Sequence, residues 1–310
     1  MTRLVLFLFI TAFHIAFAQT PKTMKELLQP YHLETKTVKL KDGDLAYVKE
    51  GKGKNILVFV HGLSSNADAW YRNIEELKKD YTCYAIDLPG YGKSYKKAPA
   101  FTPTYFAEVI KEFSEKMKLR KFTLVGHSMG GQTSLKFASL YSEKVKNLVL
   151  IAPAGIEEFT EMEGKTMLMV TTKEGVMNTS DEQIDKNYLI NFHKMPKEAA
   201  SMIADRKAIK KSSDFEAHAE AIVASVKGML DDKVIDVLPK IKKPTLLIFG
   251  KNDFLIPNRY FHPAMTIDDV AEKAKKSLCK SETVMIDEAG HFLMFEKPSE
   301  VNQAIRAFLK

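Results

Sequence analysis

The strongest constraint on this chain is an alternation of short apolar runs with segments that have helical spacing. Between most runs, as in residues 107–117, apolar side chains recur with the period of a helix. Parallel strands need such crossover connections, so the alternation predicts an α/β fold with a mostly parallel sheet. The runs are rich in Val, Ile, Leu and Phe, as in strands buried on both faces: Ile56–Val60, Cys83–Ile86, Phe122–Val125, Leu148–Ala152, Thr245–Phe249 and Thr283–Ile286.

A hairpin is predicted ahead of this pattern. Glu34–Lys41 and Asp44–Glu50 have strand character, and they flank Asp42-Gly43, which is a strong signal for a two-residue turn. At the other end of the chain, residues 301–309 have the apolar spacing of a final helix. The alternation therefore extends over almost the whole chain.

One long stretch breaks the alternation. From Gly155 to Lys243 no run has convincing strand character, and helical segments are expected near residues 181–194, 197–211 and 213–237. The last of these opens with Ser213-Asp214-Phe215-Glu216, which has the pattern of a capping box. We predict a helical cap over residues 155–239, inserted into a core formed by residues 19–154 and 240–310.

The predicted cap is rich in methionine. Met side chains adapt to varied apolar ligands, but they also fill gaps in ordinary cores. The enrichment therefore favours an adaptable apolar pocket only weakly. The cap holds seven of the fourteen methionines, at positions 162, 167, 169, 177, 195, 202 and 229.

The first eighteen residues have the pattern of a signal peptide. Arg3 precedes an apolar stretch, Leu4–Phe17, which ends in Ala16-Phe17-Ala18, a small-x-small cleavage motif. The stretch is shorter than the roughly 20 residues that a membrane span needs, so no stable membrane anchor is expected. We expect cleavage near Ala18, a mature chain beginning at Gln19, and an exported protein, either periplasmic or secreted.

Charge and cysteine content exclude several classes of protein. The net charge of +7 is spread along the chain, and no basic cluster is interleaved with aromatic residues, so nucleic-acid binding is not expected. The two cysteines, Cys83 and Cys279, are too few for a disulfide framework or a cysteine metal site.

A nucleophile is predicted where the run Phe122–Val125 ends. It leads into Gly126-His127-Ser128-Met129-Gly130-Gly131, and a helical pattern follows. This is G-x-S-x-G between a strand and a helix, the setting in which a sharp turn exposes a serine hydroxyl. Ser128 is therefore the candidate nucleophile, and the glycines allow neighbouring backbone to pass close to it.

A serine needs a general base, and the base needs a carboxylate. His291 follows the last predicted strand, and Asp253 follows the one before it, so both lie at the strand edge where parallel sheets bind ligands. The order Ser128, Asp253, His291 is the order known for nucleophiles in this setting. Three other carboxylates, which lie near the ends of predicted strands, are rivals to Asp253: Asp287, Glu157 and Glu158.

An oxyanion hole is predicted from two backbone N–H groups. The run Ile56–Val60 leads into His61-Gly62-Leu63, so the N–H of Leu63 lies in the loop after an early strand. The N–H of Met129 belongs to the residue after the candidate nucleophile. Such a pair stabilises the negative charge that develops on a carbonyl oxygen under attack.

Together these residues resemble the α/β-hydrolase superfamily, over nearly the whole chain from residue 34 onward. Residues 87–94, Asp-Leu-Pro-Gly-Tyr-Gly-Lys-Ser, are similar to the family's D-x-P-G-x-G-x-S turn, in which Asp87 is structural. The resemblance implies a mostly parallel eight-stranded sheet flanked by helices, with the helical cap inserted. It also implies two unpaired thiols, because Cys83 and Cys279 would lie too far apart across that sheet for a disulfide.

The motifs narrow the choice within the superfamily. A serine at position 128 differs from the aspartate nucleophile of haloalkane dehalogenases and epoxide hydrolases. Proline iminopeptidases tend to have Gly-Gly-Ser-Trp-Gly at this turn, and C–C hydrolases usually have Trp where this chain has Phe292. The Gly-His-Ser-Met-Gly-Gly turn is similar to that of many esterases, monoacylglycerol lipases and lactonases.

The resemblance implies a serine hydrolase that cleaves carboxylic esters through an acyl-enzyme. A small-to-medium acyl ester or a monoglyceride is the expected small-molecule substrate, and no metal or organic cofactor is implied. Amide, lactone or C–C cleavage by the same triad stays open, as does a ligand-binding protein without catalysis. The segment between Asp253 and the last strand is longer than expected and is a candidate for part of the pocket wall.

Overall fold

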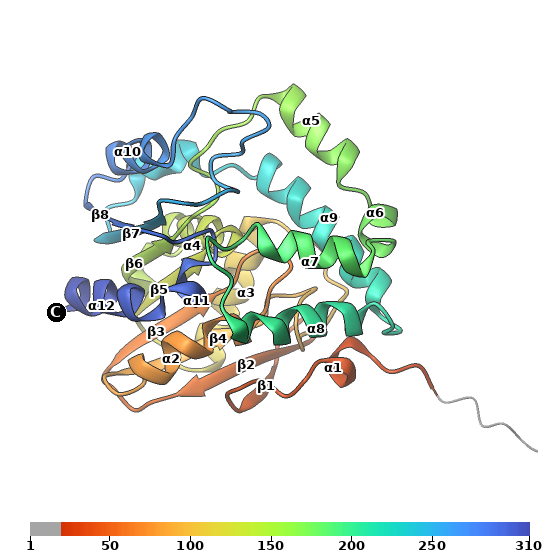
Figure 1. Cartoon of the computed structure of the whole chain (residues 1–310). Coiled ribbons are helices and arrows are strands. Elements are labelled where there is room, and N and C mark those ends of the chain that lie inside the picture. Colours follow the sequence, from red (N-terminus) through yellow and green to blue (C-terminus); the bar gives the residue numbers. More distant parts are fainter. Residues whose placement is uncertain (1–19) are drawn as a thin grey trace, which may run out of the picture.

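An eight-stranded sheet runs through the molecule and carries helices on both faces (Figure 1). In the computed structural model, which describes residues 20–310, the strand order is β1-β2-β4-β3-β5-β6-β7-β8. Every neighbouring pair from β4 to β8 is parallel, and β2 pairs antiparallel with both β1 and β4. The strands are β1 (Thr35–Lys39), β2 (Asp44–Glu50), β3 (Asn55–Val60), β4 (Tyr81–Ile86), β5 (Phe122–His127), β6 (Val145–Ile151), β7 (Thr245–Gly250) and β8 (Ser281–Ile286).

The two faces of the sheet form two separate cores. In β3 the side chains of Leu57 and Phe59 pack with one core, and those of Val58 and Val60 pack with the other. Successive side chains of a strand point to opposite faces, so a strand covered on both sides is apolar at every position. One core lies under α2 (Tyr71–Leu77), α11 (Leu293–Glu296) and α12 (Pro298–Leu309), and the other under α3 (Pro103–Lys116), α4 (Met129–Leu140) and α10 (Ile267–Ser277).

The insertion between β6 and β7 contains helices and no strand, as predicted. No strand occurs in residues 152–244, all of which the structure describes. These helices form the green-to-cyan group beside the sheet in Figure 1. They are α5 (Glu161–Val170), α6 (Lys173–Met177), α7 (Asp181–Leu189), α8 (Ala200–Ile209) and α9 (Phe215–Asp231), with 3₁₀ turns at Lys197–Ala199 and Ile235–Lys240. The fold class is thus confirmed, whereas residues 155–239 as the limits of a cap domain stay a prediction.

The capping box predicted at Ser213 is wrong. Helix α9 begins at Phe215, and the side chain of its N-cap residue, Asp214, makes no capping hydrogen bond to the helix. Instead Asp214 Oδ1 accepts a hydrogen bond from the N–H of Met24, at 2.7 Å. Met24 is the first residue of α1 (Met24–Leu27), so Asp214 satisfies a free N–H of another helix.

The hairpin is also looser than predicted. Lys39 pairs with Asp44, so the connection has four residues, closed by a hydrogen bond from the N–H of Leu40 to the carbonyl of Gly43. The side chain of Leu40 is buried in the core. The chain therefore turns two residues earlier than predicted, and Leu40 belongs to the connection while its side chain stays in the core.

Two further expectations concern the N-terminus and the cysteines. The predicted signal peptide, residues 1–18, lies outside the described residues. In the part that is described, no helix is long and apolar enough to span a membrane. Cys83 is buried in β4 and Cys279 is exposed just before β8, and both are free thiols, as the resemblance implied.

The turn after β4 is organised by one buried carboxylate. Asp87 Oδ1 accepts a hydrogen bond from the N–H of Ala67 at 2.6 Å, and Oδ2 accepts from the Tyr31 hydroxyl at 2.8 Å and the Lys93 N–H at 2.6 Å. Gly92 has φ +51°, and a Cβ there would lie 2.2 Å from Asp87 Oδ2. The turn thus needs both the carboxylate and the glycine.

We expect Asp87→Asn to lower the free energy of unfolding by about 2 to 4 kcal/mol, because an amide NH₂ would face buried N–H and O–H donors. Urea denaturation followed by circular dichroism measures the change. Asp287→Asn is the control, since that exposed carboxylate pairs with Lys251 alone among the described side chains and the loss there should be small. Equal losses in the two variants would contradict a special role for Asp87.

Candidate active site

Ser128 lies on a strained turn between β5 and α4. Its backbone has φ +50° and ψ −117°, a conformation that residues other than glycine rarely adopt. Hydrogen bonds hold it there: its N–H donates to the carbonyl of Ile151 at 3.0 Å, and its carbonyl accepts from the N–H groups of Gly131 and Ala154 at 2.8 and 3.1 Å. Ser128 is the one residue between Phe122 and Ala138 that is not buried.

The two glycines of the motif are needed for close backbone approach. A Cβ on Gly126 would lie 2.3 Å from the carbonyl oxygen of Gly130. A Cβ on Gly130 would lie 2.3 Å from the carbonyl oxygen of Val60, in β3. The start of α4 therefore packs directly on the ends of β3 and β5, and any larger residue would push the turn away.

The structure brings Asp253 and His291 together. His291 Nδ1 lies 2.8 Å from Asp253 Oδ2, and both side chains are buried. Asp253 Oδ1 accepts two more hydrogen bonds, from the N–H groups of Leu255 and Ile256 at 2.8 and 3.0 Å. With the Nδ1 proton donated to the carboxylate, the Nε2 of a neutral His291 is left as an acceptor.

The rival carboxylates have other partners. Asp287 is exposed and pairs with Lys251 at 2.8 Å. Glu157 Oε1 lies 2.5 Å from His262 Nδ1, and Glu158 pairs with Lys273. Of the four carboxylates considered from the sequence, Asp253 is therefore the one that hydrogen-bonds to His291.

Sequence reasoning missed the part that His127 plays. Its Nε2–H donates to the backbone carbonyl of His291 at 2.9 Å, and the two rings lie 4.7 Å apart. Burial, together with the nearby His291, holds the pKa of His127 well below its usual value, so the ring is neutral. His127 therefore ties the turn of Ser128 to the loop of His291. It occupies a variable position of G-x-S-x-G, so the motif carried no signal for this role.

His61 orients the loop that carries Leu63. The N–H of Leu88 donates to His61 Nε2 at 3.0 Å, so the ring proton must lie on Nδ1, which donates to the carbonyl of Gly62 at 2.7 Å. Burial lowers the pKa of His61 and favours this neutral form. Among the described residues, the N–H of Leu63 has no acceptor, and that of Met129 is the first of α4 and has none within the helix.

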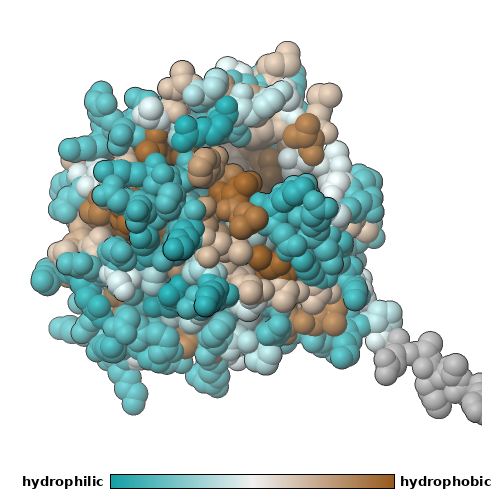
Figure 2. Space-filling model, viewed as in Figure 1, coloured by the Kyte–Doolittle hydropathy of each residue, from teal (hydrophilic) through white to brown (hydrophobic). Residues whose placement is uncertain are grey.

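Ser128 and His291 line one cavity of about 760 Å³. Its mouth is the hollow in Figure 2, where apolar side chains gather between α5, α7 and the segment after β7. Of the long segment noted in the sequence, residues 255–261 line the pocket, whereas α10 packs against β7 and β8. The apolar walls come from α5, α9 and that segment, and include Met167, Val170, Val226, Met229, Leu255, Ile256 and Phe261.

The methionines of the insertion do not act as one group. Met167 and Met229 line this cavity, whereas Met162 and Met169 are exposed to solvent.

Within residues 20–310, no group of three or more His, Cys, Asp or Glu side chains is placed to hold a metal ion.

We expect Gly126→Ala to destabilise the protein by at least about 1 to 3 kcal/mol, because the new methyl group overlaps the backbone of the turn. Gly164→Ala in α5 is the control: its Cβ would meet nothing closer than 3.7 Å, and alanine favours a helix. Thermal unfolding measures both. A Gly126 variant as stable as the parent would show that the turn relaxes without strain.

Comparisons with known proteins agree with this architecture. A sequence profile of the family described as having the alpha/beta hydrolase fold matches residues 55–298. The chain is 27% identical to an uncharacterized hydrolase of Bacillus subtilis, over 84% of this chain and 92% of the relative. It is 24% identical to a monoacylglycerol lipase of Homo sapiens, over 97% of this chain and 90% of the relative. Several other curated relatives are longer, and the chain spans less than two thirds of their length.

A solved structure shows the same fold. The crystal structure of a probable hydrolytic enzyme from Pseudomonas aeruginosa superposes with a TM-score of 0.83 at 20% sequence identity. The match covers 94% of this chain and 98% of the other. At that identity, the match bears on the arrangement of helices and strands and not on the reaction.

Proposed function

Because the chain belongs to the alpha/beta hydrolase fold family, we propose that this hydrolase is a serine hydrolase that cleaves carboxylic esters. One observation carries the proposal: a hydrogen-bonded pair of Asp253 and His291 lies at the cavity that Ser128 also lines. This is the set of groups that nucleophilic catalysis by serine requires.

The proposed reaction begins with attack of Ser128 Oγ on the ester carbonyl carbon. His291 Nε2 takes the hydroxyl proton, and Asp253 keeps the ring oriented and stabilises the imidazolium. The N–H groups of Leu63 and Met129 bind the oxyanion. The alcohol leaves with the proton from His291, and an acyl-enzyme remains. Water, activated by His291, then releases the acid and restores the serine.

The apolar walls of the cavity favour a substrate with an apolar acyl group. Apart from the polar groups near Ser128, side chains of α5, α9 and the segment after β7 present mainly carbon to the cavity. A volume of about 760 Å³ is in the range of sites for small-molecule ligands. We propose small-to-medium acyl esters or monoglycerides as substrates, and the human relative, named a monoacylglycerol lipase, supports this class.

We expect the protein to hydrolyse p-nitrophenyl esters in a series from acetate to palmitate, with Ser128→Ala lowering kcat by about 10⁴-fold or more. The best chain length would then measure the depth of the cavity. Ser139→Ala, on the same helix, is the control and should keep full activity, because Ser139 bonds only the carbonyl of Lys136 among the described residues.

Absence of turnover at any chain length, from folded protein, would contradict the ester proposal. A fluorophosphonate probe then separates the remaining possibilities. Labelling that is lost in Ser128→Ala would indicate amide, lactone or C–C cleavage by the same nucleophile. Absence of labelling would indicate a binding protein on a hydrolase scaffold.

We also propose that the chain is exported and processed near Ala18. When it is expressed with a secretion system, intact-mass measurement of the product should give a chain that begins at Gln19. Replacing Ala16 and Ala18 by bulky residues should block the cleavage. A product that retains residues 1–18 in the exported fraction would contradict the proposal.

A further inference from the structure

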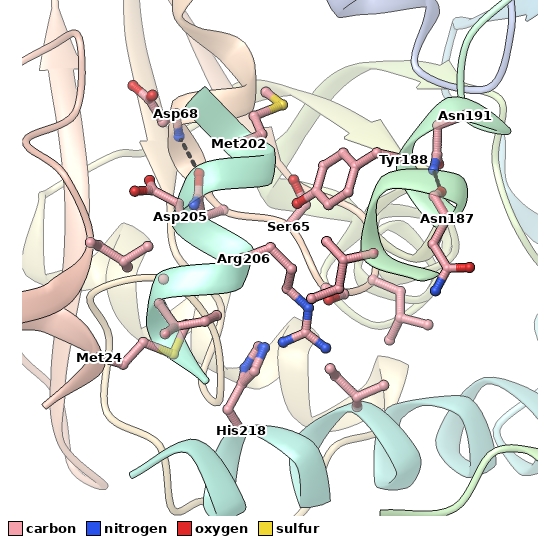
Figure 3. A pocket seen from close by; sticks show the side chains of 18 of the residues that line it. Met24, Ser65, Asp68, Asn187, Tyr188, Asn191, Met202, Asp205, Arg206 and His218 are labelled. Carbon is pink, nitrogen blue, oxygen red and sulfur yellow. Dashed lines mark hydrogen bonds between the residues drawn. The ribbon is translucent and has the colours of Figure 1, made fainter. Parts of the chain in front are cut away.

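A second cavity, of about 280 Å³, lies beside the one that holds Ser128. Leu63, Asn191 and Phe292 line both cavities, so the two meet at the loop proposed to bind the oxyanion and at the residue after His291. The second cavity is enclosed by α1, α7, α8 and α9 (Figure 3). Its volume equals that of about nine water molecules at their share of the liquid, enough for a small polar group.

Arg206 of α8 points its guanidinium into this cavity (Figure 3). Its Nη1 atom is buried without a hydrogen-bond partner, and no carboxylate of residues 20–310 forms an ion pair with it. The group lies over the ring of Phe215, at 5.3 Å from the centroid. The residue as a whole is partly exposed. A buried guanidinium N–H without an acceptor is nevertheless costly, and a ligand that accepts from it would remove the cost.

The two buried lysines of residues 20–310 have partners. Lys136 pairs with Asp232 at 2.6 Å and also donates to the carbonyl of Lys233. Lys96 donates to the carbonyl oxygens of Gly92 and Ser94. Arg206 therefore differs from these two lysines in having its polar face open to the cavity.

His218 of α9 is a second unsatisfied group at the same place. It is 2% exposed, its Nδ1 donates to the carbonyl of Gly90 at 2.8 Å, and its Nε2 has no partner among the described residues. Burial, with Arg206 nearby, lowers the pKa of His218 to about 3, so the ring is neutral and Nε2 is an acceptor. Figure 3 shows the ring beside the guanidinium. The guanidinium of Arg206 would therefore be satisfied by an anion, and Nε2 of His218 by a hydrogen-bond donor next to that anion.

Two carboxylates also line the cavity, but they already have partners. Asp68 pairs with the ring of His32 at 2.9 Å, and Asp205 accepts a hydrogen bond from the N–H of Gln29 at 3.1 Å. In Figure 3 both lie at the end of the cavity away from the guanidinium and the ring of His218. Neither carboxylate therefore occupies the end of the cavity at which the guanidinium of Arg206 lies.

We propose that this second cavity is an anion subsite, in which Arg206 binds a carboxylate or phosphate group and His218 accepts a hydrogen bond from a hydroxyl beside it. A planar guanidinium suits both kinds of anion because two of its N–H groups can bind two oxygens at once. Tyr188, which also lines the cavity, adds a neutral hydroxyl, since burial raises its pKa to about 12.

The subsite deepens the proposed function and rests on it for the substrate class. With the ester at Ser128 and its acyl chain in the larger, apolar cavity, the alcohol part would reach past Leu63 and Phe292 toward Arg206. The inferred substrates are acyl esters of small alcohols that carry a hydroxyl and an anion. Monoacyl esters of dihydroxy acids such as glycerate and of glycerol phosphate share this chemistry.

Binding tests the subsite without any turnover. In Ser128→Ala, calorimetry should detect glycerate or glycerol 3-phosphate at millimolar concentration, whereas glycerol, which lacks the charge, should not bind. When Arg206→Gln is added to Ser128→Ala, the dissociation constant for the anion should rise by about 10- to 100-fold. Lys207→Gln is the matched control: it removes a charge from the same helix, but Lys207 pairs with Asp185 and lies outside the cavity. Whichever of the two anions binds more tightly shows whether the subsite prefers a carboxylate or a phosphate.

Hydrolysis tests the same point in the otherwise unmodified protein. Hexanoyl esters of glycerol, glycerate and glycerol 3-phosphate differ only in the alcohol. The ratio of kcat/KM for the anionic over the neutral ester should fall by about 10- to 100-fold in Arg206→Gln and stay unchanged in Lys207→Gln. If Arg206→Gln does not fold, Arg206→Lys takes its place. The affinity for the anion should then fall several-fold, because an ammonium group cannot form the bidentate contact of a guanidinium.

The outcomes separate the two proposals. If neither anion binds, or if both bind equally well without Arg206, the subsite is refuted, whatever the esterase activity. If an anion binds through Arg206 while no ester is cleaved, the subsite stands and the ester proposal fails.

Discussion

The backbone turn at Ser128 is the constraint on which the site depends. Its left-handed conformation is held by hydrogen bonds from β6, α4 and the start of the insertion, and by glycines that let α4 touch the ends of β3 and β5. The turn can keep this strain because these contacts together over-determine its backbone. The parallel sheet also brings the carboxyl ends of its strands to one edge. The loops that carry Leu63, Asp253 and His291 follow β3, β7 and β8 at that same edge.

Two neutral histidines connect these loops. His61 and His127 are buried, and burial lowers the pKa of each, so each ring donates one proton to a fixed backbone carbonyl. His61 acts on the loop of Leu63, and His127 acts on the backbone of His291. A charged ring at either place would bury a charge without a partner. The geometry around Ser128 is thus set by hydrogen bonds of these two neutral rings together with those of the Asp253 carboxylate.

The helical insertion builds two cavities of different character over this edge. The larger has mainly apolar walls and contains Ser128, whereas the smaller contains Arg206 and His218 and shares Leu63 and Phe292 with the larger. A mainly apolar cavity at Ser128 and an adjoining cavity of mixed lining, with one cationic group, suit the proposed substrate with an acyl chain and a charged alcohol. Residues 255–261, which follow Asp253, complete the wall of the apolar part.

The sequence by itself predicted the strands of the parallel part of the sheet, the turn at Ser128 and the pairing of Asp253 with His291, because hydrophobic period and turn chemistry are local properties. It also placed the helical insertion, yet it predicted a capping box at Ser213 that the structure lacks, and it did not show the roles of Asp214, His127, His61 and Arg206. Those roles depend on contacts such as Asp214 with Met24 and His218 with Gly90, across many residues of chain. Only the tertiary structure decided them, because the burial of a polar group and the presence of its partner arise when distant segments pack together.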